Sequence, residues 1–218
     1  MKHVSRFLHQ WAWVILVTFC ILGLIYPVIG IGAVICMLAP IMVAFFNGRK
    51  WCGTYCPRGS FNDVILSKLS FRHKIPVLLG DNRFRTTFLI LILVGFGIQL
   101  IFSWGNISSV GRVFVRMIII TTLAAIILGI VLSHRTWCLI CPMGTIARFT
   151  AKKTSLKRKH GSIRFNQDSC IDCKLCTKSC PMNIDVHRYK TQRKVLHSDC
   201  IQCGMCVEKC PRKSLYLD

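Results

Sequence analysis

The cysteines near the C-terminal end of the chain follow one pattern twice. Residues 170–181 read CIDCKLCTKSCP and residues 200–211 read CIQCGMCVEKCP, so both stretches are C-x2-C-x2-C-x3-C-P. This spacing places three thiols on a tight turn and is typical of [4Fe–4S] ligands; in a two-cluster protein the fourth cysteine ligates the cluster of the other stretch. We therefore expect one cluster on Cys170, Cys173, Cys176 and Cys210 and a second on Cys180, Cys200, Cys203 and Cys206.

Zinc and disulfides are two alternative uses of these cysteines. Zinc sites use isolated pairs, whereas here three cysteines share a seven-residue turn and Cys-Pro follows in both stretches. Disulfides need an oxidising compartment, which the topology derived below disfavours. Pro181 and Pro211 prevent a helix from continuing through the fourth cysteine. Residues 167–218 resemble a bacterial two-cluster ferredoxin, which implies an α+β domain there.

Most of the remaining chain is apolar. Of the 218 residues, 53% are hydrophobic and 17% are charged, a balance typical of membrane proteins. Residues 11–47 contain no Lys, Arg, Asp or Glu, enough for two spans of ~20 residues and a turn at Pro27. No small-residue cleavage site follows the first apolar run, so we expect a retained anchor rather than a signal peptide. Helices are expected at about 8–27 and 31–47, and two more apolar runs follow at 87–103 and 113–133.

The basic residues indicate the orientation of these spans. The chain has 29 Lys and Arg against 8 Asp and Glu, and no nucleic-acid motif accompanies them. Eighteen of the 29 lie in residues 1–10, 48–86 and 134–169, whereas the two opposite turns hold none and two. The positive-inside rule then places both termini in the cytoplasm, and we expect the protein in the inner membrane of a bacterium. Anionic lipid and acidic protein partners suit this charge, and nucleic acid is not expected.

Two stretches in the apolar part of the chain share a second motif. Residues 49–60 read RKWCGTYCPRGS (the first Cys-Pro motif) and residues 135–145 read RTWCLICPMGT (the second Cys-Pro motif). Each follows a predicted two-helix hairpin, which predicts parallel repeats with both motifs on the cytoplasmic side. The expected fold is an all-α membrane domain of four transmembrane helices as two repeated hairpins, followed by the ferredoxin domain. Its parts are residues 1–146, with repeats at about 8–61 and 87–146, a basic linker at 147–166, and 167–218.

The repeat symmetry suggests that the four cysteines of these motifs meet. Four thiolates are what one more [4Fe–4S] cluster requires, so a third cluster is one hypothesis. A redox-active dithiol pair, a zinc or copper site and simple packing stay open as alternatives. The unequal spacing, three residues between the first pair and two between the second, bears on this choice. The candidate ligands are Cys52, Cys56, Cys138 and Cys141; Arg49, Lys50, Arg58 and Arg135 would offset negative charge, and Trp51 and Trp137 would shield the site or anchor it at the interface.

The spans themselves carry few chemical groups. None of the seven histidines lies in the middle of a span, so no haem is expected, and the absence of Asp and Glu argues against a pump. His9 and His134 flank helix ends and need no special role. Cys20 and Cys36 are expected to pack as core residues. Gln99, Arg112 and Arg116 could contact a quinone near the outer face or simply anchor the helices there.

The combination of four spans, two Cys-Pro motifs and a two-cluster segment resembles a known family. It is similar to NapH/MauN-type membrane polyferredoxins, and more distantly to the membrane cores of NosR and CcoG. The family pattern has C-x3-C-P twice, and the second motif here, from Cys138 to Pro142, is one residue shorter. The chain lacks the S-G-A-[ST] flavin-attachment sequence, so no covalent flavin is expected.

The resemblance implies an electron-transfer role. Such a subunit passes electrons between cytoplasmic or quinone-pool donors and a partner redox enzyme. We expect no catalytic residues in the chain itself, because it offers no defensible nucleophile, general base or cofactor pocket, so partner subunits would do the substrate chemistry. Two alternatives remain: a quinol dehydrogenase in its own right, and a metal-handling or assembly reductase that uses the Cys-Pro motifs.

Overall fold

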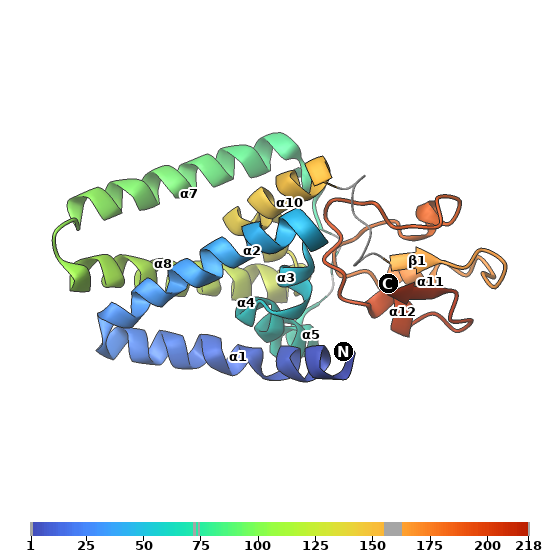
Figure 1. The fold of residues 1–218 in the computed structure, drawn as a ribbon, viewed down its shortest axis with the longest axis horizontal. Coiled ribbons are helices and arrows are strands. Elements are labelled where there is room, and N and C mark those ends of the chain that lie inside the picture. Colours follow the sequence, from blue (N-terminus) through green and yellow to red (C-terminus); the bar gives the residue numbers. More distant parts are fainter. Residues whose placement is uncertain (1, 72, 74, 155–162, 218) are drawn as a thin grey trace.

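Four long helices and a small C-terminal domain make up the computed structural model, which describes residues 2–71, 73, 75–154 and 163–217. The C-terminal domain (residues 163–217) lies at one end of the helices (Figure 1). We call residues 2–154 the membrane part, because four of its segments are long and apolar enough to span a bilayer: Phe7–Ile25, Pro27–Asn47, Asn82–Phe102 and Ile107–Val131. The elements that form these segments are α1 (Lys2–Ile25), the 3-10 helix η1 (Pro27–Gly32), α2 (Ala33–Asn47), α7 (Asn82–Phe102) and α8 (Ile107–Val131).

The helix ends differ from those that the apolar runs predicted. The side chain of Asn106 accepts hydrogen bonds from the backbone N–H groups of Ser108 and Ser109, so α8 starts at Ile107, before the apolar run at 113. Asp81 caps α7 in the same way through the N–H of Arg83. The predicted turn after α1 is a 3-10 helix that begins at Pro27.

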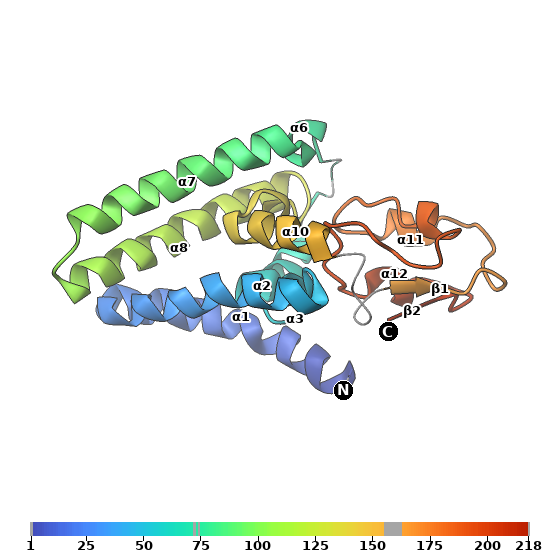
Figure 2. The same ribbon diagram turned by 45° about the horizontal axis from the view of Figure 1, so that its top comes forward.

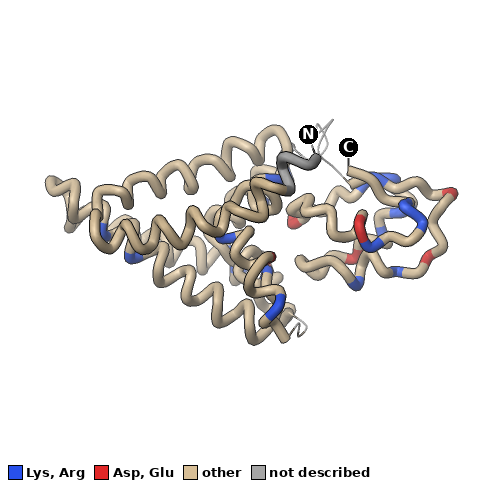
Figure 3. Tube along the Cα trace, turned by 90° about the horizontal axis from the view of Figure 1, so that it is seen from below, with Lys and Arg blue, Asp and Glu red and all other residues tan. Residues whose placement is uncertain are grey.

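The surface of the long helices is apolar. Figure 3 shows that Lys, Arg, Asp and Glu gather at the end that carries the C-terminal domain and on that domain, with a few basic residues at the far end. Large side chains along the helices are exposed, among them Phe46 at 73% and Ile101 at 73%. A continuous apolar surface of this kind is unfavourable in water and favourable in lipid, which is consistent with a membrane protein.

Both Cys-Pro motifs lie at the end of the helices next to the C-terminal domain (Figures 1 and 2). The short elements there are α3 (Lys50–Thr54), α4 (Pro57–Phe61), the π-helix η2 (Asn62–Leu66), α5 (Ser67–Leu69), α6 (Val77–Gly80), α9 (Trp137–Ile140) and α10 (Pro142–Thr154). The helix α10 occupies the start of the predicted linker and packs against α2 and α7, with Ala147 and Ala151 fully buried. Residues 155–162 of that linker lie outside the described residues.

The C-terminal domain is built around a two-stranded sheet. The strand β1 (Ile163–Phe165), at the end of the predicted linker, pairs antiparallel with β2 (Leu215–Leu217). The helix α11 (Leu175–Lys178) packs against α12 (Met205–Glu208), and η4 (His187–Tyr189) lies between them in sequence. The core beneath the sheet is formed by the buried side chains Ile163, Phe165, Ile184, Val186, Val195, Ile201 and Leu215.

Two glycines let η1 approach α8 closely. A Cβ atom on Gly111 would lie 1.9 Å from the carbonyl oxygen of Pro27, and one on Gly30 would lie 2.3 Å from the carbonyl oxygen of Gly111. Both contacts are with backbone, which cannot move aside as a flexible side chain could. Small residues at a helix contact are the usual means of close packing between membrane helices. These two positions therefore fix the first hairpin onto the second.

We predict that Gly111→Ala destabilises the chain by at least about 2 kcal/mol, because an overpacked contact forces the backbone apart. Thermal unfolding of the detergent-solubilised protein would measure it. The matched control is Gly97→Ala, in α7, where the added Cβ meets no described heavy atom within 4 Å beyond its chain neighbours and the backbone of its own helix. That change should stay within about 1 kcal/mol of the parent or stabilise it. Equal unfolding temperatures for the two variants would contradict the packing described here.

Candidate iron–sulfur centres

Each of the two predicted sets of C-terminal cysteines lies around its own cavity. Both cavities have an empty volume of about 340 Å³, part of which opens to solvent. We call them the outer site and the inner site, and the inner site is the one nearer the membrane part. The outer site is lined by Cys170, Cys173, Cys176 and Cys210, and the inner site by Cys180, Cys200, Cys203 and Cys206.

The backbone takes the same path in both cysteine stretches. The residue before the second cysteine has positive φ in each, 55° at Asp172 and 56° at Gln202. The residue after that cysteine does too, 55° at Lys174 and 80° at Gly204. Left-handed residues at these positions curl the chain around the cavity, and a short helix then begins at once. The helix ends before the fourth cysteine, which a proline follows.

The outer and inner sites are neighbours in one domain. The thiol of Cys176, from the outer site, lies close enough to that of Cys206, from the inner site, to affect its charge. Burial raises the pKa of Cys203 to about 11 and also raises that of Cys206, where the other cysteines of the inner site add to the effect. Unligated, these groups would be neutral thiols at pH 7. Thiolate ligands in such a place need a bound metal centre to hold them ionised.

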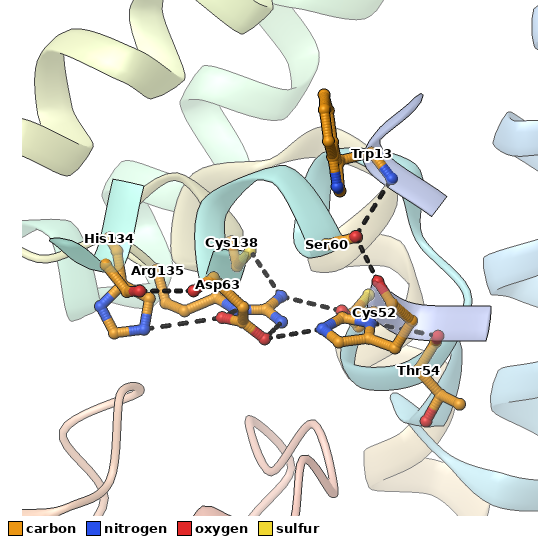
Figure 4. A network of polar contacts seen from close by, with 10 residues as sticks. Trp13, Cys52, Thr54, Ser60, Asp63, His134, Arg135 and Cys138 are labelled. Atoms are coloured by element: carbon orange, nitrogen blue, oxygen red, sulfur yellow. Dashed lines mark hydrogen bonds and ion pairs between the residues drawn. The ribbon is translucent and has the colours of Figure 1, made fainter. Parts of the chain in front are cut away.

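The two Cys-Pro motifs are joined by two crossing arginines. Nη2 of Arg49 donates to the carbonyl oxygen of Cys138 at 2.5 Å, and Nη1 of Arg135 donates to the carbonyl oxygen of Cys52 at 2.8 Å. Figure 4 shows the second of these contacts, in which the Arg135 guanidinium also approaches Sγ of Cys138, at 3.6 Å. Each motif thus binds the backbone of the other through its first residue.

The glycine of each motif makes room for the crossing arginine. A Cβ on Gly59 would lie 2.8 Å from Nη1 of Arg135, and one on Gly144 would lie 2.7 Å from Nη2 of Arg49. In the pattern R-x-W-C…C-P-x-G, the packing of arginine against glycine therefore explains both the first residue and the last. The arginine reaches across, and the glycine of the other motif accommodates it.

The four cysteines of the motifs lie within electrostatic reach of one another. Cys52 and Cys138 are buried, and Cys56 and Cys141 are half-buried. Burial, followed by the nearby Cys52 and Cys138, raises the pKa of Cys56 to about 12. Burial also raises the pKa of Cys52, on which Cys138 and Cys141 act as well. The structure therefore brings the four predicted residues together, and we call this group the surface site.

Asp63 is the counter-ion of Arg135. Oδ1 of Asp63 lies 2.7 Å from Nε of Arg135, and Nε2 of His9 lies 2.9 Å from Oδ2. Nε2 of His134 lies further from this carboxylate, at 3.6 Å from Oδ1 (Figure 4). Burial alone would raise the pKa of Asp63, but Arg135 and then His9 outweigh it and hold the pKa well below its usual range. The sequence indicated no special role for the two histidines, and in the structure both lie against this carboxylate.

Asp199, in the C-terminal domain, is the counter-ion of Arg49. Its carboxylate lies 2.8 Å from Nη1 of Arg49, 3.0 Å from Nη1 of Arg85 and 3.1 Å from Nε of Arg148. Burial opposes ionisation, but the three guanidinium groups hold the pKa of Asp199 below its usual value. Asp63, Asp199, Arg85 and Arg148 lie outside the cysteine motifs of the sequence. The contact between Arg49 and Asp199 joins residues 150 positions apart, with no local pattern to reveal it.

The loop of the inner site rests on the first Cys-Pro motif. A Cβ on Gly53 would lie 2.1 Å from the carbonyl oxygen of Ile201 and 3.4 Å from the N of Cys203. Nε2 of Gln202 donates to the carbonyl oxygen of Asn47, at the C-terminal end of α2, at 2.6 Å. The backbone of the membrane part at Gly53, next to Cys52, therefore touches the backbone of the C-terminal domain at Ile201, two residues before Cys203.

The other residues that the sequence singled out lie around this group. Arg58 reaches Oγ1 of Thr121 on α8 at 2.9 Å and stands 5.8 Å from the ring centroid of Trp137. Trp137 is only 3% exposed, so it shields the site rather than anchoring at an interface. Trp51 is half-buried against Tyr55, at 5.6 Å between ring centroids, and Lys50 is also half-buried.

Two of the candidate quinone residues make hydrogen bonds within their own helices. Gln99 donates to the carbonyl oxygen of Gly95 in its own helix, Arg112 donates to Ser109, and Arg116 is exposed. Of the cysteines within the spans, Cys20 is half-buried and Cys36 is exposed. The prediction that Cys36 packs in a core is therefore wrong; α2 presents it outward.

The surface site suits a negatively charged group. Four guanidinium groups, those of Arg49, Arg85, Arg135 and Arg148, face two carboxylates there. Buried positive charge in excess is unfavourable, and four thiolates around a cluster would offset it. Among the described residues, Nε of Arg49 and Nε1 of Trp137 are buried N–H groups with no hydrogen-bond acceptor, and cluster sulfur is an acceptor.

A single metal ion fits less well. Within the described part of the chain, no three His, Cys, Asp or Glu side chains are grouped as the ligands of one ion would be. Cubane ligands lie further apart, because each binds a different iron. The described thiols are therefore not grouped as the ligands of a single zinc or copper ion are.

Two sequence families match parts of the chain. Residues 162–211 match the 4Fe-4S dicluster domain, and residues 29–76 and 115–160 both match the 4Fe-4S binding domain. The second match includes a Cys-Pro motif in each segment. No solved structure matches the chain. The chain therefore contains 4Fe–4S ferredoxin-type domains, which supports bound iron–sulfur clusters.

Three curated proteins are similar to the chain. Two are from Methanocaldococcus jannaschii: Uncharacterized protein MJ0750, 27% identical over 90% of this chain and 87% of that protein, and Uncharacterized protein MJ0749, 24% identical over 72% and 61%. The third is the "Putative electron transport protein YccM" of Escherichia coli (strain K12), 28% identical over 74% of this chain. The chain spans 49% of YccM and 61% of MJ0749.

We predict that Asp63→Asn lowers stability by about 3–5 kcal/mol at pH 7, because it leaves the buried Arg135 without its carboxylate. The depressed pKa of Asp63 gives stability that is present above the unfolded pKa of about 3.9 and is lost as the pH falls through the lower folded value. The difference from the parent should therefore hold from pH 8 to pH 5 and begin to shrink only below about pH 4. Thermal unfolding across that range measures it.

The control for this prediction is Asp81→Asn. It makes the same chemical change at an exposed helix cap, where asparagine caps as well as aspartate, so stability should change by less than about 0.5 kcal/mol. Similar losses in both variants, or a difference that grows as the pH falls, would contradict the ion pair.

Proposed function

We propose that the chain is a membrane-anchored iron–sulfur electron-transfer subunit, of the NapH/MauN type, in a bacterial inner-membrane redox complex. The observation that carries the proposal is the direct contact of the inner-site loop with the first Cys-Pro motif, at Ile201 and Gly53. It makes the three groups of cysteines a continuous series. The name of YccM, "Putative electron transport protein", supports the same interpretation over the part of YccM that this chain spans.

The cysteines of each site would hold a [4Fe–4S] cluster, which supplies one-electron transfer at each step. The outer and inner sites would use the eight ferredoxin cysteines. At the surface site, Cys52, Cys56, Cys138 and Cys141 would be the ligands. Arg135 would contribute its N–H near Cys138, and the buried charges of Arg49 and Arg135 would favour the reduced state, because hydrogen bonds and net charge set cluster potentials.

The electron path runs between the exposed end of the C-terminal domain and the membrane. At the outer site Cys173 is exposed, and Ile171 and Leu175 beside it are 56% and 43% exposed. Lys174 and Arg212 are exposed at the same cavity. An acidic redox partner would suit this end. The inner site lies between it and the surface site, from which a quinone or a partner subunit in the membrane exchanges electrons.

The burial of the surface cysteines disfavours a thiol-exchange role. A reactive dithiol needs an accessible cysteine of lowered pKa, whereas burial raises the pKa of both Cys52 and Cys56. A carrier of a single metal ion is disfavoured by the thiol spacing described above. An assembly or metal-handling reductase therefore fits the residues less well than electron transfer.

We predict about twelve irons per chain, with matching acid-labile sulfide, in anaerobically purified protein. Cys52→Ala or Cys138→Ala should each remove about four irons and leave the EPR signals of the two ferredoxin clusters unchanged. Iron and sulfide assays with EPR after reduction measure this.

The control is Cys36→Ala, an exposed thiol outside all three sites, which should keep the parent iron content. A parent value of about eight irons would overturn the third cluster and leave the ferredoxin pair in place. Parent iron in Cys52→Ala would do the same.

A further inference from the structure

Among the described residues, half-buried Asp63 and buried Asp199 have similar surroundings. Asp63 binds Arg135 of the second Cys-Pro motif and His9, near the start of α1. Asp199 binds Arg49 of the first Cys-Pro motif and Arg85, near the start of α7. Each carboxylate thus pairs with one crossing arginine and contacts one basic side chain at the start of a hairpin. The difference is that Asp63 belongs to the membrane part and Asp199 to the C-terminal domain.

The sequence explains why the second carboxylate comes from another domain. Asp63 is the seventh residue after Cys56, and the seventh residue after Cys141 is Arg148. The first motif therefore carries its own acid where the second carries a base. Arg148 itself pairs with Asp199, at 3.1 Å. Because position 148 holds an arginine, Arg49, 1% exposed, and Arg85, 2% exposed, need a carboxylate from outside the membrane part.

We propose that Asp199 is the positioning residue that locks the C-terminal domain onto the membrane part, by supplying the counter-charge that position 148 lacks. Asp199 precedes Cys200 and lies near Cys203, so the same ion pairs seat the inner site against Cys52. Removing the domain would leave three clustered guanidinium groups without a carboxylate, which is strongly unfavourable. The domain is therefore a fixed part of the electron path and not a tethered shuttle.

The docking rests on contacts that do not require any cluster. Its consequence for electron transfer rests on the proposed function. Two contacts independent of the ion pairs, Gly53 against Ile201 and Gln202 on Asn47, report whether the domain is seated. The peptides that contain them are therefore suitable probes, and they lie on opposite sides of the contact.

The test is hydrogen–deuterium exchange on the full chain, purified anaerobically. Asp199→Asn should speed exchange at least about tenfold in residues 51–55 and 200–204, because the contact that protects them opens. Asp199→Glu, which keeps the charge, should retain most of the protection. The control Asp172→Asn removes an exposed carboxylate that pairs with Lys190 at 2.8 Å within the C-terminal domain, and should leave both segments as in the parent.

A second variant separates docking from folding. Arg148→Asp combined with Asp199→Asn gives the second motif its own acid, as at Asp63, so the membrane part should fold while the C-terminal domain stays undocked. Parent-like protection in Asp199→Asn or in the double variant would overturn the proposal, and so would loss of the folded chain in both. Iron is assayed on the same samples. Eight irons in the parent would overturn the third cluster and leave the docking result unchanged. Fast exchange with full iron in Asp199→Asn would support the docking role of Asp199 alone.

Discussion

Two fully buried guanidinium groups constrain the rest of this structure. Arg49 and Arg135 are 1% and 0% exposed, and each reaches the backbone of the other Cys-Pro motif. A buried charge is tolerated only where carboxylates and hydrogen-bond acceptors surround it. The glycines at 59 and 144, the carbonyl groups of Cys52 and Cys138, and the places of Asp63 and Asp199 all follow from that requirement. The arginines bring the four cysteines together, so the geometry of the candidate site is set by the charges around it.

The same requirement extends beyond the membrane part. Asp63 can be supplied locally, because η2 follows the first Cys-Pro motif and lies beside it. The carboxylate for Arg49 is not supplied locally. It is Asp199 of the C-terminal domain, and its ion pairs with Arg49 and Arg148 join that domain to the membrane part. Backbone contact at Gly53 then follows, since a side chain there would meet the carbonyl oxygen of Ile201. Electrostatics selects the orientation of the domain, and the absence of a side chain at Gly53 lets the two cysteine sites approach.

The sequence predicted the parts that have a local pattern. Apolar runs located four helices, and the cysteine spacing located the two sets that line the outer and inner sites. Helix ends were missed where capping residues, Asp81 and Asn106, extend a helix beyond its apolar run. The ion pairs were missed because they join residues far apart in the chain. One signal was present: aligning the two Cys-Pro motifs places Asp63 opposite Arg148. A reversal of charge at equivalent half-buried positions indicates that the partner ion comes from elsewhere.

The buried arginines also change how the basic charge of the chain is understood. Of the eighteen Lys and Arg that favour a cytoplasmic position for both termini, four, namely Arg49, Arg85, Arg135 and Arg148, are engaged with Asp63 or Asp199. Fourteen remain, against the two on the opposite side, so the predicted orientation does not depend on the site residues. Charge thus serves two separate purposes at this end of the molecule. The exposed residues would orient the chain in the bilayer, and the buried ones organise the contact through which electrons would pass.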